Sequence, residues 1–266
     1  MFSSRKQQPR KPYRIGLALS GGGARGFAHL GALKALRDHG IVPDVVAGVS
    51  AGSVVAAFHG AGLTEDKVLS IFQGARFKDF AEMIVPRRGF FALDRFIAMI
   101  EHECGVRRIE DLSVPTVICA TDFDQGRRVE FTSGRLGERV AASCAIPIVF
   151  EPVVIGGVRY VDGGVLHNLP AWALRDRCDY LIGVSCSPMP DLESRSGGIV
   201  DVARRSFMLM AKSNIYPDLE LCDLPVELTE VAGHAVFDLK QIEVLVEQGY
   251  LCMLRALRAA PRLPQL

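Results

Sequence analysis

Apolar residues in the first quarter of the chain form two short continuous runs, each followed by a segment with helical spacing. The first run, 13–19, and the second, 45–48, are rich in the aliphatic residues that favour buried strands. The segment after the first run repeats leucine at Leu30, Leu33 and Leu36, which is the spacing of one helix face. Two successive strand–loop–helix units predict parallel strands whose loops meet at one edge of a sheet.

The rest of the chain continues as an alternation of helices and strands, with no internal repeat and no low-complexity tract. A Gly-Gly pair at 156–157, placed between two short apolar runs, predicts a hairpin. The alternation as a whole predicts an α/β fold. Helices are expected over 65–72, 77–84, 93–100, 136–144, 170–177, 199–212 and 240–257, and strands over 114–121, 129–131, 153–155, 158–161, 180–186 and 225–228.

Between the second strand and its helix the chain reads Gly48-Val49-Ser50-Ala51-Gly52, which is the pattern G-x-S-x-G. A serine on a sharp turn after a parallel strand exposes its hydroxyl beside the first amides of the next helix, where negative charge is stabilised. Side chains in place of Gly48 and Gly52 would crowd such a turn. Because the motif is short, a turn of small residues that contains a serine by chance explains this stretch alone equally well.

The first strand leads into a glycine-rich loop that precedes a helix. Its sequence matches G-x-G-x-x-G, the pattern of a dinucleotide-binding turn. Such a site needs an acidic residue at the end of the second strand, whereas Asp44 stands at the beginning of that strand. Exposed amides at a helix N-terminus also form a cradle for an oxyanion, which is the interpretation we favour. The loop consists of Gly21, Gly22, Gly23, Ala24, Arg25 and Gly26.

Polar residues near these turns have both structural and chemical interpretations. Arg25 is either a surface arginine or a group that favours an anionic transition state or organises the loop. His29, one turn into the following helix, is predicted to be a packed, hydrogen-bonded core residue. Asp162 directly follows a predicted strand and precedes Gly163 and Gly164, a placement typical of a catalytic or a capping carboxylate. This stretch alone favours the cap.

Composition narrows the classes of function. The chain has 266 residues and a formal net charge of +1, which gives no reason to expect nucleic acid as a partner. Its seven cysteines are an odd number, widely scattered and without a C-x-x-C pair. That pattern predicts neither a disulfide framework nor a zinc site, and it favours a reducing, cytoplasmic setting.

Three stretches bear on targeting and on membranes. Residues 1–12 are basic and polar, which predicts a flexible tail and no signal peptide. The uncharged stretch 45–64 is interrupted by glycines, serines and a histidine, which predicts a buried strand and helix in place of a membrane span. The loop 86–91 places a basic pair beside two phenylalanines, which predicts either peripheral contact with a lipid surface or an ordinary loop with inward aromatic rings.

Taken in order, the glycine loop, the G-x-S-x-G turn and Asp162-Gly163-Gly164 resemble the patatin-like phospholipase family. The likeness is greatest to its compact bacterial members, which are related to the catalytic domain of neuropathy target esterase. The block 142–147, Ala-Ser-Cys-Ala-Ile-Pro, resembles a further family motif. The resemblance covers residues 13–190 well and the last quarter loosely. It implies one three-layer α/β/α hydrolase domain over 13–266, with a mostly parallel central sheet.

The resemblance also implies a catalytic dyad, with Ser50 as the nucleophile, Asp162 as its base and the 21–26 loop as the oxyanion hole. The implied reaction is hydrolysis of acyl esters, commonly of phospholipids or lysophospholipids, with no metal and no cofactor. Family members often have Asp before the glycine triplet where this chain has Ser20, a difference expected to alter loop capping more than the chemistry. A free carboxylate has a pKa of about 4, so burial of Asp162 would have to raise its basicity.

Two other functions remain open. Ser50, Asp162 and His234 follow the chain order of a Ser-Asp-His triad in α/β-hydrolases, although the serine turn there usually follows a later strand and His234 lies in loop-like sequence. A non-catalytic nucleotide- or lipid-binding module that keeps the glycine loop is the second alternative, against which the intact Ser50 and Asp162 argue. The dyad hypothesis predicts that none of the six histidines is essential.

Overall fold

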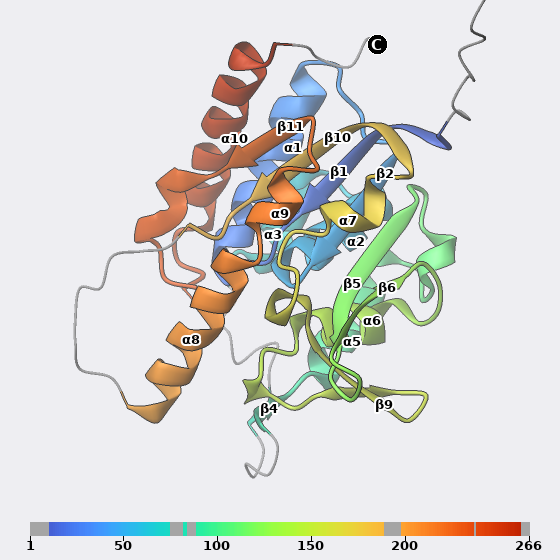
Figure 1. Cartoon of the computed structure of the whole chain (residues 1–266), viewed down its shortest axis with the longest axis vertical. Coiled ribbons are helices and arrows are strands. Elements are labelled where there is room, and N and C mark those ends of the chain that lie inside the picture. Colours follow the sequence, from blue (N-terminus) through green and yellow to red (C-terminus); the bar gives the residue numbers. More distant parts are fainter. Residues whose placement is uncertain (1–10, 75–81, 84–88, 189–197, 237, 262–266) are drawn as a thin grey trace, which may run out of the picture.

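The fold is built on a mostly parallel sheet of eight strands, drawn in Figure 1. The computed structural model describes residues 11–74, 82–83, 89–188, 198–236 and 238–261. The strands of this sheet are β1 (Tyr13–Leu19), β2 (Val45–Val49), β5 (Thr116–Asp122), β6 (Arg127–Phe131), β8 (Val153–Ile155), β9 (Val158–Asp162), β10 (Cys178–Ser185) and β11 (Leu224–Glu227). Their order is β11-β10-β1-β2-β5-β9-β8, with β6 also paired to β5. Pairing is parallel from β11 to β5, and β6, β9 and β8 join it antiparallel.

Helices cover both faces of the sheet. The helices are α1 (Ala28–Asp38), α2 (Ala51–Gly60), α3 (Glu65–Phe72), α5 (Asp94–Cys104), α6 (Leu136–Cys144), α7 (Ala171–Leu174), α8 (Ile199–Ser213), α9 (Tyr216–Leu219) and α10 (Ile242–Ala259). Alternate residues of β1 point to opposite faces. Leu17 and Leu19 pack into a core with residues of α1, α2, α3, α5, α6 and α10, whereas Ala18 packs into a second core with residues of α7 and with Ile215. The predicted three-layer α/β/α architecture is confirmed.

The C-terminal helix α10 packs directly against α1, beside which it lies in Figure 1. Glycines allow the two backbones to touch. A Cβ atom on Gly31 would lie 1.8 Å from the carbonyl oxygen of Val246, and one on Gly249 would lie 1.9 Å from that of Ala28. The backbone of α10 therefore contacts the backbone of α1, the helix that follows the glycine loop.

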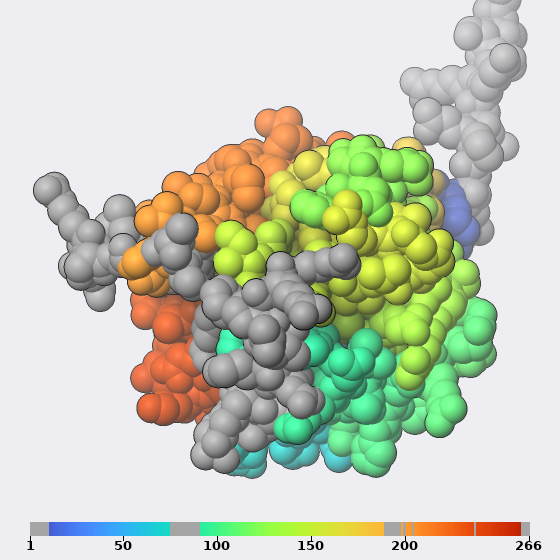
Figure 2. All heavy atoms as spheres, turned by 90° about the horizontal axis from the view of Figure 1, so that it is seen from below, coloured from blue at the N-terminus to red at the C-terminus, as the bar shows by residue number. Residues whose placement is uncertain are grey.

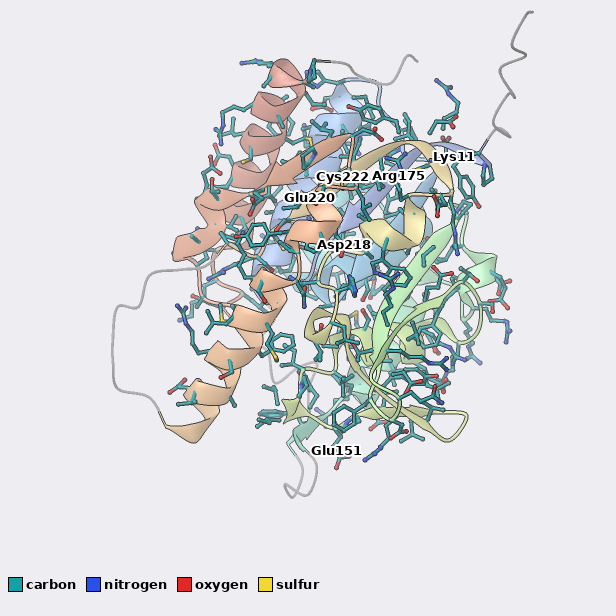
Figure 3. The ribbon with its side chains drawn as sticks, viewed as in Figure 1. Lys11, Glu151, Arg175, Asp218, Glu220 and Cys222 are labelled. Carbon is teal, nitrogen blue, oxygen red and sulfur yellow. The ribbon has the colours of Figure 1, made fainter. Side chains whose placement is uncertain are left out.

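Polar contacts around α7 and α9 reinforce the part of the fold in which Figure 3 labels Arg175 and Asp218. The buried Asp218 carboxylate accepts a hydrogen bond from the Trp172 amide at 2.9 Å and contacts the His167 ring at 2.8 Å. Arg175 donates to the Asp223 carboxylate at 2.7 Å. These contacts hold the segment that follows β9 and leads into α7.

Most predicted elements are confirmed to within a few residues, and one is wrong. The predicted helix 77–84 lies mostly outside the described residues, and its described part, Glu82–Met83, is strand β3. This strand belongs to a second sheet in the order β3-β4-β7, with β4 at Gly89–Ala92 and β7 at Ile148–Phe150. The predicted helix 170–177 is helical only over α7.

Two expectations about membranes can be compared with the structure in part. No helix within the described ranges is long and apolar enough to cross a membrane. Residues 86–88 of the predicted lipid-contacting loop lie outside those ranges, while Phe91 on β4 packs against Phe150, with ring centroids 6.3 Å apart. The inward orientation of Phe91 agrees with the interpretation of an ordinary loop.

Candidate active site

The chain turns sharply at Ser50, between the end of β2 and the start of α2. Ser50 has φ 52° and ψ −125°, a conformation that residues other than glycine rarely adopt and that costs about 1–3 kcal/mol. A Cβ atom on Gly52 would lie 2.2 Å from the Leu19 carbonyl oxygen, and one on Gly48 would lie 2.2 Å from the Gly52 carbonyl oxygen. The glycine-flanked turn predicted from the sequence is confirmed.

The glycine loop lies directly against this turn. A Cβ atom on Gly21 would be 3.0 Å from the Ser50 Cβ, and one on Gly26 would be 2.5 Å from the Ala51 Cβ. The loop leaves β1 and enters the short 3-10 helix Gly23–Phe27, which continues as α1. The two loops that follow β1 and β2 therefore meet at one sheet edge, as the two strand–loop–helix units predict.

The amides of the loop fall into two groups. The Gly21 amide donates to the Asn168 carbonyl at 3.1 Å, and the Ala24 amide donates to the Val236 carbonyl at 2.7 Å. The Gly22 and Gly23 amides, at the start of the 3-10 helix, donate to no acceptor in the part of the chain that the structure describes. Those two amides are consequently the available donors of the loop.

Arg25 organises the loop. Its guanidinium is buried and donates to the carbonyl oxygens of His234 at 2.8 Å, Pro188 at 2.9 Å and Ala232 at 3.0 Å. The bonds to His234 and Ala232 tie the glycine loop to the segment before α10, and the bond to Pro188 ties it to the segment after β10. Of the interpretations open for Arg25, the structure excludes an exposed surface arginine and supports an organising role.

Ser20 anchors the beginning of the loop to the neighbouring strand. The Ser20 hydroxyl donates to the Gly21 carbonyl at 2.9 Å and accepts from the Cys186 amide at 3.0 Å. His29 contacts the Ser20 carbonyl through Nε2 at 2.9 Å, and burial lowers the pKa of His29 to about 4. The predicted core role of His29 is confirmed. Ser20 anchors the start of the loop, and the expected effect of serine in place of aspartate on loop capping and chemistry stays a prediction.

Asp162 ends β9 and is fully buried beside Ser50. Its Oδ1 accepts the Gly164 amide at 2.8 Å, so the predicted cap is present. Burial raises the pKa of Asp162 from the usual 3.8 to about 7, and the nearby Ser50 hydroxyl and the Gly164 amide lower it only in part. Oδ2 has no well-aligned hydrogen-bond partner among the described residues, so the Ser50 contact is looser than a formed hydrogen bond.

Ser50 borders two cavities. One, of about 170 Å³, is lined almost entirely by carbon. The other, of about 50 Å³, is also mostly carbon but includes Asp162, Asn168 and Ser187 in its lining, and we call it the polar cavity. The apolar cavity is lined by Gly23, Ala24, Gly26, Phe27, Leu30, Ser50, Ala51, Val54, Val55, Val68, Phe72, Leu93, Phe96, Cys144, Ile146, Phe150, Val236 and Leu239. The polar cavity is lined by Gly21, Gly22, Gly23, Arg25, Ser50, Ile146, Asp162, Asn168, Ser187, Pro188, Phe207, Met208, Ala211 and Val236.

Helix α8 forms one wall of the polar cavity through Phe207 and Met208. The Phe207 ring lies 3.1 Å from the place that a Cβ atom on Gly164 would take. A Cβ atom on Gly163 would be 3.0 Å from the Val49 side chain. On the face shown in Figure 2, orange spheres, which include α8, adjoin yellow-green spheres from the middle of the chain. Both glycines after Asp162 therefore allow close packing beside the cavity.

The residues of the alternative sites are not assembled in the same way. Across the described ranges, no histidine side chain hydrogen-bonds to Ser50 or Asp162, and His234 lines neither cavity. Asp44 accepts from the amides of Arg14 and Ile15 at the opposite end of β1 from the glycine loop. Within the described residues, His234 does not complete a Ser-Asp-His triad and Asp44 does not lie beside the glycine loop.

One family accounts for this arrangement of motifs. Residues 17–175 match the family described as patatin-like phospholipase, and this stretch contains the glycine loop, the Ser50 turn and Asp162. The chain belongs to the patatin-like phospholipase family. The resemblance found in the sequence is thereby confirmed.

The relatives of this patatin-like chain are longer proteins. An uncharacterised NTE family protein of Mycobacterium tuberculosis is 35% identical over 168 residues, which are 59% of this chain and 44% of that protein. Neuropathy target esterase sws of Drosophila melanogaster is 33% identical over 168 residues, 59% of this chain and 12% of that protein. Lysophospholipase NTE1 of Eremothecium gossypii is 30% identical over 184 residues, 66% of this chain and 12% of that protein. This chain thus spans less than half the length of these relatives.

Two solved structures share the fold at low sequence identity. VipD from Legionella pneumophila superposes with a TM-score of 0.53 at 14% identity, covering 98% of this chain and 72% of that one. ExoU from Pseudomonas aeruginosa, in complex with SpcU, superposes with a TM-score of 0.50 at 14% identity, covering 96% and 54%. The likeness extends over nearly the whole patatin-like chain, including residues after 175 that the family match leaves out.

Sequence reasoning missed several residues around Ser50. Asn168 accepts from the Gly21 amide and donates through Nδ2 to the Ser187 hydroxyl at 3.0 Å. Phe207 lies on a long amphipathic helix with no motif to mark it. Ser143 was part of the 142–147 block, which was a signal for the family but not for a role. All three act through contacts between distant parts of the chain, which local patterns do not encode.

Proposed function

We propose that this patatin-like protein is a serine acyl hydrolase that cleaves carboxylic esters of lipids through Ser50 and Asp162. The observation that carries the proposal is the position of Ser50, in a strained turn between an apolar cavity and a polar cavity that is lined in part by the buried Asp162. The names of the relatives, an esterase and a lysophospholipase, support the same class of reaction.

In the proposed reaction, Asp162 Oδ2 accepts the proton of the Ser50 hydroxyl as Ser50 Oγ attacks the ester carbonyl carbon. A carboxylate with a pKa of about 7 is a far better base at neutral pH than one with the usual 3.8. The protonated Asp162 then gives its proton to the leaving alcohol, and an acyl-Ser50 ester remains. Water then attacks this ester with Asp162 again as the base. The proton passes from Asp162 to Ser50 Oγ as the bond to the acyl group breaks, which releases the carboxylic acid and restores the Ser50 hydroxyl.

The developing oxyanion needs donors that are fixed before the reaction. We assign this role to the Gly22 and Gly23 amides, because they have no acceptor in the described structure and line the same cavity as Ser50. One such donor contributes about 3–4 kcal/mol to transition-state stabilisation. The bonds made by Gly21, Ala24 and Arg25 hold the loop so that these two amides stay in place.

The apolar cavity is assigned to the acyl chain, because Ser50 borders it and its described lining is almost entirely carbon. The polar cavity beside it takes the leaving alcohol. This division predicts preference for esters with an aliphatic acyl part over esters of small polar acids. Peripheral contact with a lipid surface and a cytoplasmic location belong to the same proposal.

Filling the apolar cavity is expected to shift the acyl-chain preference. Val54 lines this cavity one helical turn after Ser50, so Val54→Phe leaves less room for the acyl chain. We expect kcat/KM for p-nitrophenyl laurate to fall at least about tenfold relative to p-nitrophenyl butyrate. Val42→Phe, at a position 60% exposed, is the matched control and should leave this ratio unchanged. Equal losses for both esters in Val54→Phe would contradict the assignment.

The pH dependence of the native enzyme follows from the buried base. We expect kcat/KM for a soluble p-nitrophenyl ester to rise with pH through about 7 and then level off, because Asp162 must be ionised to accept the Ser50 proton. Initial rates between about pH 5 and pH 9 measure the profile. A rate already level at about pH 5.5 would show that the base has an ordinary carboxyl pKa.

The experiment that tests the function is turnover of a panel of p-nitrophenyl esters, phospholipids and lysophospholipids, with Ser50→Ala as the control. Calorimetry with ATP and NAD on the same sample tests the nucleotide-binding alternative. Turnover that disappears in Ser50→Ala supports the hydrolase. Tight nucleotide binding without ester turnover, or equal turnover in Ser50→Ala, would overturn it.

A further inference from the structure

Two side-chain hydroxyls hold the peptide groups on either side of Ser50. The Ser143 Oγ accepts the Ser50 amide at 2.8 Å, and the Ser53 Oγ donates to the Ser50 carbonyl at 2.6 Å. The Ser143 hydroxyl also donates to the Cys119 carbonyl at 2.6 Å. Ser143 lies near the end of α6 and is fully buried. Its hydroxyl therefore bonds to these two protein groups and is not exposed to solvent.

The end of the same helix also holds Asp162. The carbonyl of Ala145, which caps the C-terminus of α6, accepts the Asp162 amide at 2.9 Å. The last carbonyls of a helix have no partner within the helix, so this bond uses a group that would otherwise be unsatisfied. Within three consecutive residues, α6 therefore contacts the backbones of both Ser50 and Asp162.

No direct strand pairing fixes the distance between these two residues. Ser50 follows β2 and Asp162 ends β9, and β5 lies between these strands in the sheet. On β5, Cys119 stands opposite Val49, and Ala120 stands opposite Asp162. The Ser143 hydroxyl bonds to the Cys119 carbonyl as well, so the end of α6 contacts the ends of β2 and β9 and the middle of β5.

We propose that Ser143 is a positioning residue that, together with the Ala145 carbonyl, sets the placement of the Ser50 hydroxyl relative to the Asp162 carboxylate. This inference rests on the catalytic roles proposed above for Ser50 and Asp162. It assigns a role to the serine of the 142–147 block.

The strained backbone at Ser50 explains why a positioning hydrogen bond to Ser143 is needed. A residue other than glycine keeps a positive φ only when its surroundings over-determine it. Without the Ser143 hydroxyl, the buried Ser50 amide loses its partner, and the turn can relax towards ordinary backbone angles. A displacement of about 1 Å of a reacting group lowers the rate about 100-fold. A role limited to stability would leave the chemistry of the folded protein unchanged.

The test compares Ser143→Ala with Ser143→Thr, which retains a hydroxyl, and with Ser185→Ala. Ser185 is the matched control because it is equally buried on β10 but its hydroxyl has no hydrogen-bond partner among the described residues. For a soluble p-nitrophenyl ester, we expect kcat to fall about 10- to 100-fold in Ser143→Ala with KM nearly unchanged. Ser143→Thr should recover most of this loss, and Ser185→Ala should behave as the native protein.

The pH profile supplies a readout that a purely structural role would not move. The Ser50 hydroxyl lowers the pKa of Asp162, so moving it away should shift the acidic limb of the Ser143→Ala profile to higher pH. The other titratable or charged groups near the carboxylate are the Cys144 thiol on α6 and Arg25, which lines the same cavity, and neither is altered.

Native kcat and a native acidic limb in folded Ser143→Ala would overturn the positioning role. Where Ser143→Ala does not fold, Ser143→Cys takes its place, since a thiol of similar size forms weaker hydrogen bonds. In that variant a partial loss of kcat supports the role, and native kinetics overturn it. Failure of the proposed function is distinguishable, because turnover would then persist in Ser50→Ala and Asp162→Asn.

Discussion

Asp162→Asn is expected to lower kcat for p-nitrophenyl esters by about 10³-fold or more while the protein still folds and binds substrate. Asparagine keeps the shape of the side chain and its acceptor for the Gly164 amide at Oδ1. It cannot take the Ser50 proton, and in the described structure no histidine lies in position to replace it. Steady-state kinetics of the purified variant measure the loss, with KM expected to change little.

Asp218→Asn is the matched control for this prediction. Asp218, labelled in Figure 3, is as buried as Asp162 but lies on α9 and lines neither cavity. Its replacement keeps the Oδ1 acceptor for the Trp172 amide and changes the Oδ2 contact to His167, which affects stability and not the reacting groups. Near-native turnover in Asp162→Asn would show that another base serves Ser50. A folded His234→Ala variant that lost turnover would then restore the triad hypothesis.

The parts of the site that the sequence predicts are those that depend on neighbours along the chain. The turn at Ser50 needs glycine at positions 48 and 52, because a Cβ atom at either position would clash with a neighbouring backbone carbonyl. The five consecutive residues 48–52 are enough to predict this requirement. The two strand–loop–helix units also place the glycine loop beside it, because right-handed crossovers leave little choice.

The parts that the sequence does not predict depend on distant partners. Which loop amides remain available is decided by the carbonyls of Asn168 and Val236, which accept from Gly21 and Ala24. The link from Ser143 to Ser50 spans 93 positions, and no periodicity marks it. The second sheet was missed because β3 and β7 have two and three residues, too short for an alternating pattern to appear.

The same burial that makes Asp162 a useful base is expected to destabilise the protein above neutral pH. Burial raises the pKa of Asp162 from 3.8 to about 7, so between these values the folded state binds a proton that the unfolded state has lost. The free energy of unfolding should therefore fall as pH rises from about 4 to about 7, and stay low above that. A pKa difference of this size corresponds to about 4 kcal/mol.

Asp162→Asn removes this contribution, because the amide does not ionise. Urea unfolding of the native protein and of the variant, at about pH 5 and about pH 8.5, measures the effect as a difference of differences. We expect the variant to gain stability relative to the native protein at the higher pH. This gain is reduced by about 1–3 kcal/mol, because the buried amide nitrogen of the variant lies where Oδ2 now has no well-aligned partner among the described residues.

Ser50→Ala separates stability from catalysis in this measurement. It abolishes turnover but keeps the buried carboxylate, and it removes the hydroxyl that lowers the pKa of Asp162. Its stability should therefore decline with pH at least as steeply as that of the native protein. If native protein and Asp162→Asn instead showed parallel pH dependence, the Asp162 carboxylate would have an ordinary pKa. The dyad would then lack the raised basicity on which the proposed reaction depends.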